Sequence, residues 1–371
     1  MSWESIIQDS ISSIEDLTNY LDVNDEDKVV LEKICEDHPL RISRYYLSLI
    51  DQNNEEDPIR KLAIPQAHES YMEGSYDTSG EKSNTVLPGL QHKYRETVVI
   101  LATNECAMYC RHCFRKRLVG IETNEVIQDI QDAVAYIENH KEINNVLITG
   151  GDPFVLSNKR IEQFLAALTK IDHLDFIRFG TRVPVTFPRR IISDDNLVKI
   201  LRSYNKKKRL YLVTQFNHPR EITKESIQAC KNLQEAGITI SNQTVLLRGV
   251  NDNPDVMAQL QRGLVRIGVI PYYVFQCRPV KRVKKQFQVQ LYDGVRIIQE
   301  TRSRLDGHTK RFRFIISHPT GKIEILGISN EKFLFKYHQA KNPEDIGVIF
   351  SRPVDKNSTW LDDLRVEKGK Q

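Results

Sequence analysis

The sequence has no long hydrophobic run, and its net charge is small. No stretch of about eighteen apolar residues occurs among its 371 residues, which excludes a transmembrane helix. The first residues, Met1 to Glu4, lack the basic and then apolar segments of a secretory signal, so we expect a cytoplasmic protein. Lys and Arg number 53 against 49 Asp and Glu, and this excess of four does not indicate a protein that binds nucleic acid.

Low-complexity tracts and internal repeats are also absent. Glycine and proline number only 17 and 14, while 40% of the residues are hydrophobic and 27% are charged. This composition excludes disordered, collagenous and repeat-array proteins and is typical of a globular protein. At roughly 150 residues per domain, the length allows about two and a half domains or one large α/β barrel with extensions.

The pattern of apolar residues divides the chain into three segments. Apolar residues at helical spacing predict a helical N-terminal region, and residues 73–84, which have no aliphatic side chain, predict a linker. We place the boundaries at residues 1–86, 87–310 and 311–371. The last segment is predicted to contain two strands around a turn, at 312–317 and 322–326, followed by an uninformative polar tail.

In the central segment, short apolar runs alternate with longer amphipathic ones. Strands are predicted at 97–102, 146–149, 176–180, 209–214, 238–245 and 269–276, and helices at 125–137, 160–168 and 224–236. Strands that alternate with helices favour parallel pairing with crossovers of one hand. The fold class is therefore predicted to be α/β, as a partial TIM-type barrel of (β/α)6 form.

Three of the six cysteines lie within eight residues. Cys106, Cys110 and Cys113 follow the predicted strand 97–102, where α/β barrels carry their chemistry. Thiolates spaced C-x3-C-x2-C can hold three irons of a four-iron four-sulfur cluster, which leaves the fourth iron open to another ligand. The alternative is a structural zinc site that takes its fourth ligand from His112, His92 or a distant cysteine.

The segment CAMYCRHCFRKR, residues 106–117, resembles the signature of radical S-adenosylmethionine (SAM) enzymes, and specifically that of the lysine 2,3-aminomutase family. The similarity extends beyond the cysteines, in the family's order, over roughly residues 10–325. The further blocks are YYLSLID at 45–51, DPIRK at 57–61, GGD at 150–152, FNHP at 216–219, NQ at 242–243, VLLRGVND at 245–252 and PYY at 271–273.

The resemblance implies a site for SAM. Its amino and carboxylate groups would bind the open iron of the cluster held by the three cysteines. The motif of Gly150, Gly151 and Asp152 matches the family's contact with the methionine end of SAM. Gln243 matches a further contact, and Gln215 stands where the family has histidine.

A second cofactor, pyridoxal phosphate, is implied by the lysine that would hold it covalently, Lys322. The pair Lys93 and Tyr94 takes the place of the family's arginine and tyrosine at the phosphate. Thr97 and Phe275 replace another arginine and a tyrosine that contact the phosphate, and each lost charge-assisted hydrogen bond would cost about 1.5 to 3 kcal/mol.

The substrate contacts differ from those of the family. Arg115 matches the residue that pairs with the α-carboxylate of the substrate, where a guanidinium suits a planar carboxylate. The two acidic residues that hold the ε-amine of lysine fall on Arg278 and Ser317. Because an arginine would repel an ammonium group, we expect a substrate with an acidic or uncharged tail, glutamate being the simplest.

The predicted activity is the transfer of an amino group from C2 to C3 of an α-amino acid by an isomerase. One alternative is a radical SAM enzyme without pyridoxal phosphate that acts on a protein or an RNA-bound substrate, and another is a zinc-stabilised interaction protein without catalysis. The expected partners are a small amino acid, an electron donor such as flavodoxin or ferredoxin, and further copies in a homo-oligomer, with no membrane or nucleic acid. The family's late zinc-binding cysteines are missing, with Asn253 at one position, so no zinc is predicted.

Overall fold

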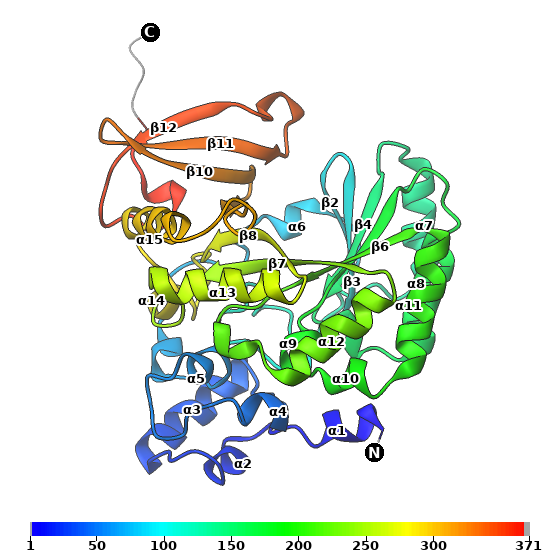
Figure 1. Ribbon diagram of the computed structural model, residues 1–371, viewed down its shortest axis with the longest axis horizontal. Coiled ribbons are helices and arrows are strands. Elements are labelled where there is room, and N and C mark those ends of the chain that lie inside the picture. The colour runs from blue at the N-terminus through cyan, green and yellow to red at the C-terminus, as the bar shows by residue number, and fades with distance from the viewer. Residues whose placement is uncertain (1, 367–371) are drawn as a thin grey trace.

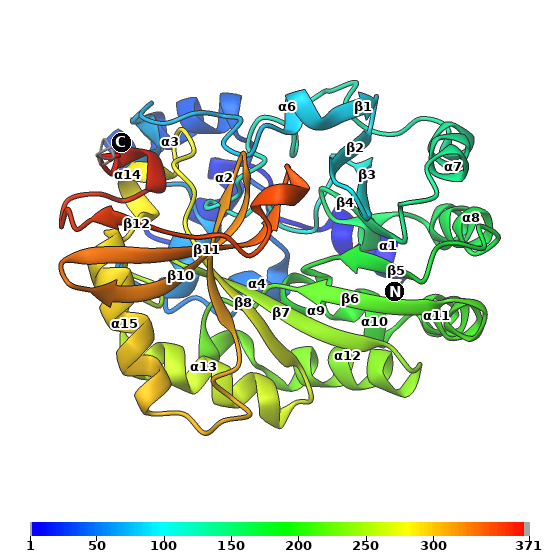
Figure 2. The same cartoon turned by 90° about the horizontal axis from the view of Figure 1, so that it is seen from above.

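Six parallel strands form the centre of the protein, which the computed structural model describes over residues 2–366. Each pairs with the next in sequence order, and Figure 2 shows them curving around one centre. The partial (β/α)6 barrel predicted from the sequence is therefore confirmed. These strands are β3 (Thr97–Thr103), β4 (Asn145–Gly150), β5 (Phe176–Gly180), β6 (Arg209–Thr214), β7 (Thr239–Leu246) and β8 (Ile270–Gln276).

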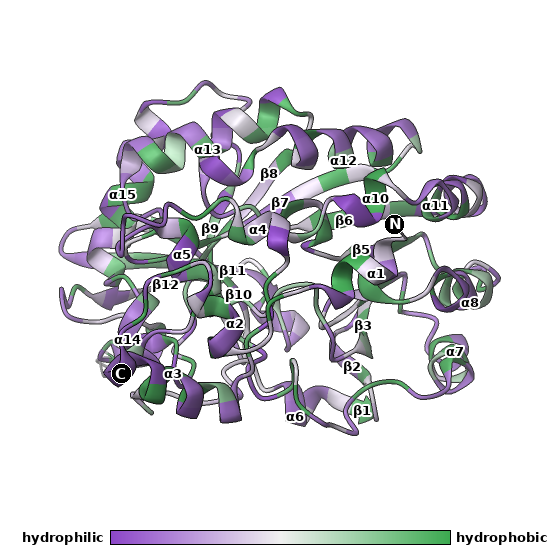
Figure 3. Ribbon diagram, turned by 90° about the horizontal axis from the view of Figure 1, so that it is seen from below, coloured by the Kyte–Doolittle hydropathy of each residue, from purple (hydrophilic) through white to green (hydrophobic). Residues whose placement is uncertain are grey.

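Long helices cover the outside of these strands, with their more polar faces outward (Figure 3). In α8, for example, the buried residues Ile161, Phe164, Leu165 and Leu168 recur at helical spacing, and Ser157 caps the first turn. The covering helices are α7 (Ile130–Asn139), α8 (Asn158–Leu168), α11 (Asp195–Lys207), α12 (Lys224–Glu235), α13 (Pro254–Arg266) and α15 (Leu291–Ser303). Shorter helices are α9 (Val183–Thr186), α10 (Arg189–Ile192) and α14 (Lys284–Phe287), with single 3-10 turns at Pro153–Val155, Pro219–Glu221, Pro343–Asp345 and Leu361–Asp363.

The helix predicted at 125–137 begins five residues later than expected. Asp129 caps α7 by accepting a hydrogen bond from the Gln131 amide. Ile127, which continues the apolar pattern upstream, instead donates its amide to the Leu101 carbonyl at 2.9 Å and is buried as part of a loop. The apolar spacing alone therefore overextends the helix. Helices α11, α13 and α15 lie in connections between strands for which the sequence analysis gave no helix.

The N-terminal region is helical, as predicted, and lies below the barrel in Figure 1. Its buried residues, including Leu17, Ile34 and Leu62, belong to the same hydrophobic core as those of the barrel. The elements are α1 (Trp3–Gln8), α2 (Ile14–Thr18), α3 (Asp25–Asp37), α4 (Arg44–Leu47), α5 (Pro58–Ala63) and the 3-10 helix η1 (Ala67–Ser70).

The predicted linker has more structure than its composition indicates. It ends in the short helix α6 (Glu81–Asn84), whose first amides, those of Glu81 and Lys82, donate to the Asp77 carboxylate. The hairpin β1 (Thr85–Leu87) and β2 (Leu90–Tyr94) follows and pairs antiparallel with β3. The linker is thus attached to the first barrel strand.

The C-terminal segment extends the sheet beyond the barrel. Strand β9 (Arg313–His318), which the sequence predicted at 312–317, pairs parallel with β8 and adds a seventh parallel strand to the six predicted for the barrel. The antiparallel strands β10 (Gly321–Ser329), β11 (Lys332–Ala340) and β12 (Ile349–Pro353) follow, at the top of Figure 1, and β12 lies in the tail that the sequence left unassigned. Since β1 and β12 are the two edges of the sheet, the barrel is open within residues 2–366.

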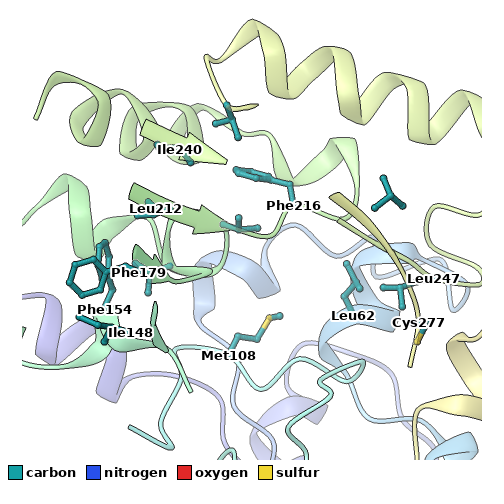
Figure 4. Close-up of a cluster of buried hydrophobic side chains, with 14 of the residues drawn as sticks. Leu62, Met108, Ile148, Phe154, Phe179, Leu212, Phe216, Ile240, Leu247 and Cys277 are labelled. Atoms are coloured by element: carbon teal, nitrogen blue, oxygen red, sulfur yellow. The ribbon is translucent and has the colours of Figure 1, made fainter. Parts of the chain in front are cut away.

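Alternating strand residues separate the core from the barrel interior. Ile148, Phe179, Leu212 and Ile240 are register partners on β4 to β7 and belong to the hydrophobic core seen in Figure 4. Their sequence neighbours therefore point into the barrel. One core spans all three predicted segments, and the boundaries at residues 86 and 310 stay a prediction. In the described chain, the longest and most apolar helices still fall short of what crossing a bilayer requires.

Candidate active site

A cavity of about 380 Å³ lies where the parallel strands end. Every functional residue predicted from the sequence lines it, although these residues come from the linker hairpin, the barrel and the C-terminal strands. They are Lys93, Tyr94, Cys106, Cys110, Cys113, Arg115, Gly150, Gly151, Asp152, Gln215, Gln243, Arg278, Ser317 and Lys322. Thr97 and Phe275, the two departures from the family at the phosphate, line it as well.

The three cysteines of the loop after β3 are free thiols on one side of the cavity. Burial raises the pKa of Cys106 and raises that of Cys113 to about 11. Two N–H groups point at the sulfurs: Arg182 Nη1 lies 2.8 Å from Cys110 Sγ, and the Arg115 amide lies 3.3 Å from Cys113 Sγ. Donors of this kind stabilise thiolates, the form that binds iron.

These thiols fit an iron-sulfur cluster better than a closed zinc site. Among residues 2–366, no three side chains of His, Cys, Asp or Glu are gathered into a ready-made site for a single metal ion. Of the fourth zinc ligands suggested by the sequence, His92 bonds Tyr136 and lies outside the cavity, whereas His112 lines the cavity with its Nε2 facing the Asn217 amide. Three thiols without a fourth ligand match a cluster with one open iron.

The glycine motif connects β4 to the cysteine loop. Gly150 has a φ of +114°, and a Cβ on Gly151 would lie 2.3 Å from the Glu105 carbonyl oxygen, so both positions require glycine. The Asp152 amide donates to the same carbonyl at 2.8 Å. The backbone can therefore approach both the cysteines and a ligand closely.

The Asp152 carboxylate is fully hydrogen-bonded within the protein. It accepts from Thr181 Oγ1 at 2.6 Å, the Arg182 amide at 2.7 Å and the Phe154 amide at 3.0 Å. Burial raises its pKa above the ordinary value, although these bonds oppose the shift. In this arrangement Asp152 orders the turns after β4 and β5, besides facing the cavity.

Two further cavity residues lie near the cysteines: His112, which the sequence suggested only as a possible zinc ligand, and Arg182, which it did not single out. His112 lies inside the cysteine motif, and burial lowers the pKa of its imidazole to about 3, so the ring is neutral. Its Nδ1 has no hydrogen-bond partner. Arg182 follows β5 and donates its Nε to the Gln215 carbonyl at 2.8 Å. Only the cysteine spacing pointed to the first, and no motif pointed to the second.

Lys322 lies on the opposite side of the cavity, on β10. Burial lowers the pKa of its amine from 10.5 to about 7, and the nearby cations Arg178, Lys93 and Arg278 add to this shift. The Nζ atom faces the rings of Tyr273 at 5.3 Å and Tyr94 at 5.6 Å. A lysine that is half neutral near pH 7 can attack a carbonyl group, as the imine with pyridoxal phosphate requires.

Cations that suit a phosphate group surround Lys322. Burial lowers the pKa of Lys93 to about 8, and its Nζ donates to the carbonyls of His318 at 2.6 Å and Ser79 at 3.3 Å. Arg178 also lines the cavity, and its Nε has no partner. Sequence reasoning missed Arg178 because it lies within a predicted strand.

Arg178 offsets the missing arginine at position 97. Asn145 Oδ1 accepts from Arg178 Nη2 at 2.5 Å and lies 3.2 Å from Thr97 Oγ1, so the guanidinium and the threonine share one partner. The Arg178 guanidinium of β5 therefore lies beside Thr97. The residues present fit a pyridoxal phosphate.

Arg115 is held by a buried carboxylate from the linker. Its Nε donates to Glu81 at 2.9 Å, its Nη1 lies 3.3 Å from the Gly150 carbonyl, and Arg117 donates to the other Glu81 oxygen at 2.9 Å. Although burial opposes it, Arg115, Arg278 and Arg117 hold the pKa of Glu81 below its ordinary value. The linker composition gave no signal for Glu81.

Arg278 follows β8 and lies over the Phe114 ring, 4.0 Å from its centre. Its Nη2 donates to Ser317 Oγ at 2.8 Å, and its Nη1 is buried without any partner. Burial lowers the pKa of this guanidinium to about 10, although Glu81 opposes the shift. Ser317 is the register partner of Lys322, so Arg278 stands beside the candidate pyridoxal lysine.

Comparison with known proteins decides the family. The model of the Radical SAM superfamily matches residues 100–260. An L-lysine 2,3-aminomutase of Clostridium subterminale is 37% identical over 366 residues, 95% of this chain and 84% of its own. A protein of Aquifex aeolicus, provisionally named an L-lysine 2,3-aminomutase, is 40% identical over 94% of each chain. The chain belongs to the lysine 2,3-aminomutase family.

The family includes more than one substrate specificity. A glutamate 2,3-aminomutase of Clostridioides difficile is 37% identical over 317 residues, 85% of this chain and 74% of its own. As a radical SAM aminomutase, this chain is an isomerase of a small molecule that uses a four-iron four-sulfur cluster, SAM and pyridoxal phosphate. A solved radical SAM methyltransferase from Sphaerobacter thermophilus covers 61% of the chain at 18% identity, with a TM-score of 0.35.

Proposed function

We propose that this aminomutase moves the α-amino group of an amino acid with an anionic tail to C3, with glutamate as the simplest substrate. The supporting observation is the buried Arg278 Nη1, which has no partner in the cavity. A buried donor without a partner costs about 1 to 3 kcal/mol, and more when it is charged. A carboxylate on the substrate would remove that cost.

The charge of the cavity supports the same proposal. Six basic side chains line it against two carboxylates, and one of these carboxylates, Glu81, is already paired with arginines. The basic residues are Lys93, Arg115, Arg178, Arg182, Arg278 and Lys322, of which the four arginines stay charged at neutral pH. The side-chain ammonium of a lysine substrate would lie next to the Arg278 guanidinium. Two like charges 4 Å apart repel by about 4 kcal/mol at an effective dielectric constant of 20.

The roles of the individual residues belong to this proposal. Cys106, Cys110 and Cys113 would ligate three irons; Gly150, Gly151, Asp152, Gln215 and Gln243 would line the SAM site; Lys93, Tyr94 and Lys322 would hold pyridoxal phosphate. When bound, the cluster and SAM supply the radical, and pyridoxal phosphate carries the migrating nitrogen. The chain's own residues would hold the substrate by its carboxylates.

Arg115 and Arg278 would fix the two ends of the substrate. Arg115 would pair with the α-carboxylate, and Arg278 with Ser317 would take the distal carboxylate next to Lys322. When both ends of the substrate are bound, the carbon atoms between them have little conformational freedom. The hydrogen on C3 then points in one fixed direction. Such orientation is one of the larger contributions a protein makes to a reaction.

The alternative radical enzyme without pyridoxal phosphate has less support. It was suggested by Thr97 and Phe275, but Arg178 stands beside Thr97 through Asn145. The lowered pKa of Lys322 is also what an amine that binds an aldehyde requires. The proposal further includes a cytoplasmic location, in keeping with six free thiols, a flavodoxin or ferredoxin as electron donor, and a homo-oligomer.

The deciding experiment is an amino-acid screen on anaerobically reconstituted enzyme with SAM and pyridoxal phosphate. Formation of the β-isomers of glutamate, aspartate, glutamine and lysine would be followed by chromatography. We expect glutamate to give the highest kcat/KM and lysine to be poor. Rapid lysine turnover with inert glutamate would overturn the proposed substrate, and SAM cleavage without any pyridoxal absorbance would favour the alternative enzyme.

A further inference from the structure

The sequence did not single out Arg182. Each of its three guanidinium nitrogens donates a hydrogen bond. Its Nε donates to the Gln215 carbonyl at 2.8 Å, its Nη1 donates to Cys110 Sγ at 2.8 Å, and its Nη2 donates to Glu221. The residue is 8% exposed, so water competes little for these bonds. The guanidinium is thus fixed with one N–H directed at a proposed cluster ligand.

Glu221 holds the Arg182 guanidinium in this position. Its side chain has no solvent exposure, and besides Arg182 it accepts from Tyr46 Oη at 2.6 Å, the Asn217 amide at 2.5 Å and the His218 amide at 3.0 Å. A carboxylate with this many donors cannot turn away without leaving buried groups unpaired. Glu221 is therefore a positioning residue for Arg182.

We propose that Arg182 raises the reduction potential of the cluster through its hydrogen bond to Cys110 and its buried positive charge. Reduction brings one electron from a low-potential one-electron donor onto the cluster, and no proton or bond changes at Arg182. The added negative charge is stabilised by a fixed cation and by an N–H donor to sulfur, more so in a dry interior than in water. The inference rests on the proposed cluster ligands but not on the substrate.

A second buried arginine shows what a purely structural role looks like. Arg190 is also buried, but its Nε donates to the Phe154 carbonyl at 2.8 Å and its Nη2 to Asn158 Oδ1 at 2.7 Å, and it pairs with Asp194. It does not line the cavity. Arg182 differs because one of its donors is directed at a thiol instead of a carbonyl or carboxylate.

The test is a redox titration of reconstituted enzyme, with the reduced cluster measured by EPR at set potentials. Iron, sulfide and absorbance first establish that the cluster is present, which tests the ligands separately. In Arg182→Gln we expect at least a tenfold fall in the ratio of reduced to oxidised cluster at a fixed potential, equal to 59 mV for one electron. Arg182→Lys, which keeps the charge, should fall between this variant and the wild type.

The matched control is Arg189→Gln, which removes the same charge from the same segment but at an exposed position. Its potential should equal that of the wild type. A fully loaded Arg182→Gln enzyme with an unchanged potential would overturn the proposal. An equal shift in the control would overturn it too, since the effect would then follow net charge.

A second measurement covers the case in which Arg182→Gln fails to fold. Wild-type enzyme made with arginine labelled by 15N in the guanidino group alone would be reduced and examined by pulsed EPR. We expect a 15N hyperfine coupling to the cluster that disappears in Arg182→Lys. A wild-type spectrum without this coupling, or one that persists in Arg182→Lys, would contradict the assigned hydrogen bond.

Discussion

Arg278 donates a hydrogen bond to Ser317 across the cavity end of β8 and β9, at 2.8 Å, and leaves its second terminal nitrogen unpaired. By the resemblance given in the sequence analysis, these two positions match the acidic residues that hold the ε-amine of lysine. Under the proposed function, this pair of side chains reverses the charge at the distal end of the substrate site. The consequence for substrate specificity can be tested by placing acidic residues at both positions.

Replacing this pair with carboxylates should change the substrate preference. In Arg278→Asp combined with Ser317→Asp, a distal ammonium gains two partners, whereas a distal carboxylate is repelled. We expect the ratio of kcat/KM for lysine to that for glutamate to rise about 100-fold or more, equivalent to about 2.7 kcal/mol. Arg278→Gln is the neutral control and should lower glutamate turnover without a gain for lysine. A double variant with unchanged preference would show that Arg278 does not contact the tail.

Binding of pyridoxal phosphate should depend on pH through Lys322. Burial and neighbouring cations lower the pKa of this amine from 10.5 to about 7, so it becomes neutral as pH rises through that value. Since only the neutral amine attacks an aldehyde, the rate of covalent binding should rise between pH 6 and 8 and then level off. The rate can be followed by the absorbance of the bound cofactor, with borohydride trapping as a check. A rate that keeps rising toward pH 10 would indicate an unperturbed lysine.

The depressed pKa of Lys322 has a matching effect on stability. Between about pH 7 and 10.5 the unfolded chain binds a proton that the folded lysine does not, so this group makes the free energy of unfolding rise with pH in that window. Lys322→Met, which keeps the apolar length, should remove this component from unfolding curves of the protein without cofactor. The same variant should retain its iron and lose covalent pyridoxal. A pH dependence identical to the wild type would contradict the shifted pKa.

Glu81→Gln should weaken substrate binding by releasing Arg115. The variant removes the carboxylate that pairs with Arg115 and Arg117, both largely buried, while it keeps the size of the side chain. Removing one partner of a buried ion pair costs about 3 to 5 kcal/mol of stability. We expect a lower urea midpoint and a KM increase of about tenfold or more for the amino acid. The exposed Glu122→Gln is the control, and an unaltered KM in Glu81→Gln would show that Arg115 holds its place without Glu81.

Local motifs explain what the sequence predicted correctly. The cysteines and the glycine motif at 150–152 lie at or just after strand ends, and parallel strands bring such ends together at one edge, whereas Gln243 lines the cavity from within β7. Alternation of apolar runs was therefore enough to place them near each other. The strand β9 was predicted, but its parallel pairing with β8 was not, because the segment between β8 and β9 contains a loop and two helices, α14 and α15, where the alternation was hard to follow.

Contacts between distant residues explain what was missed. Arg182 meets Glu221 39 positions away, and Arg115 meets Glu81 34 positions away, with no periodic pattern that links either pair. The composition of residues 73–84, without aliphatic side chains, predicted a linker. It could not show that the single carboxylate of Glu81 would be buried against two arginines of the cysteine loop. Such pairs are set by the closed fold, not by local sequence.

Glu69 should determine both the acid stability of the protein and the retention of its cluster. This carboxylate has no solvent exposure and pairs with Arg111 and Lys116, which flank Cys113 in the cysteine loop. Although burial opposes it, the two cations lower its pKa from 4.5 to about 2. Its contribution to stability is therefore fully present above about pH 4.5 and is lost as the pH falls through about 2.

In Glu69→Gln, two buried cations lose their partner, at a cost of about 3 to 5 kcal/mol. We expect unfolding at a lower urea concentration near neutral pH, with a smaller difference from the wild type as the pH falls toward 2. Because Arg111 and Lys116 anchor the cysteine loop to the N-terminal region, reconstituted protein should also lose iron faster to a chelator. Glu36→Gln, at an exposed position of α3, is the control for both measurements. Equal iron loss in the two variants would mean that the anchor does not support the cluster loop.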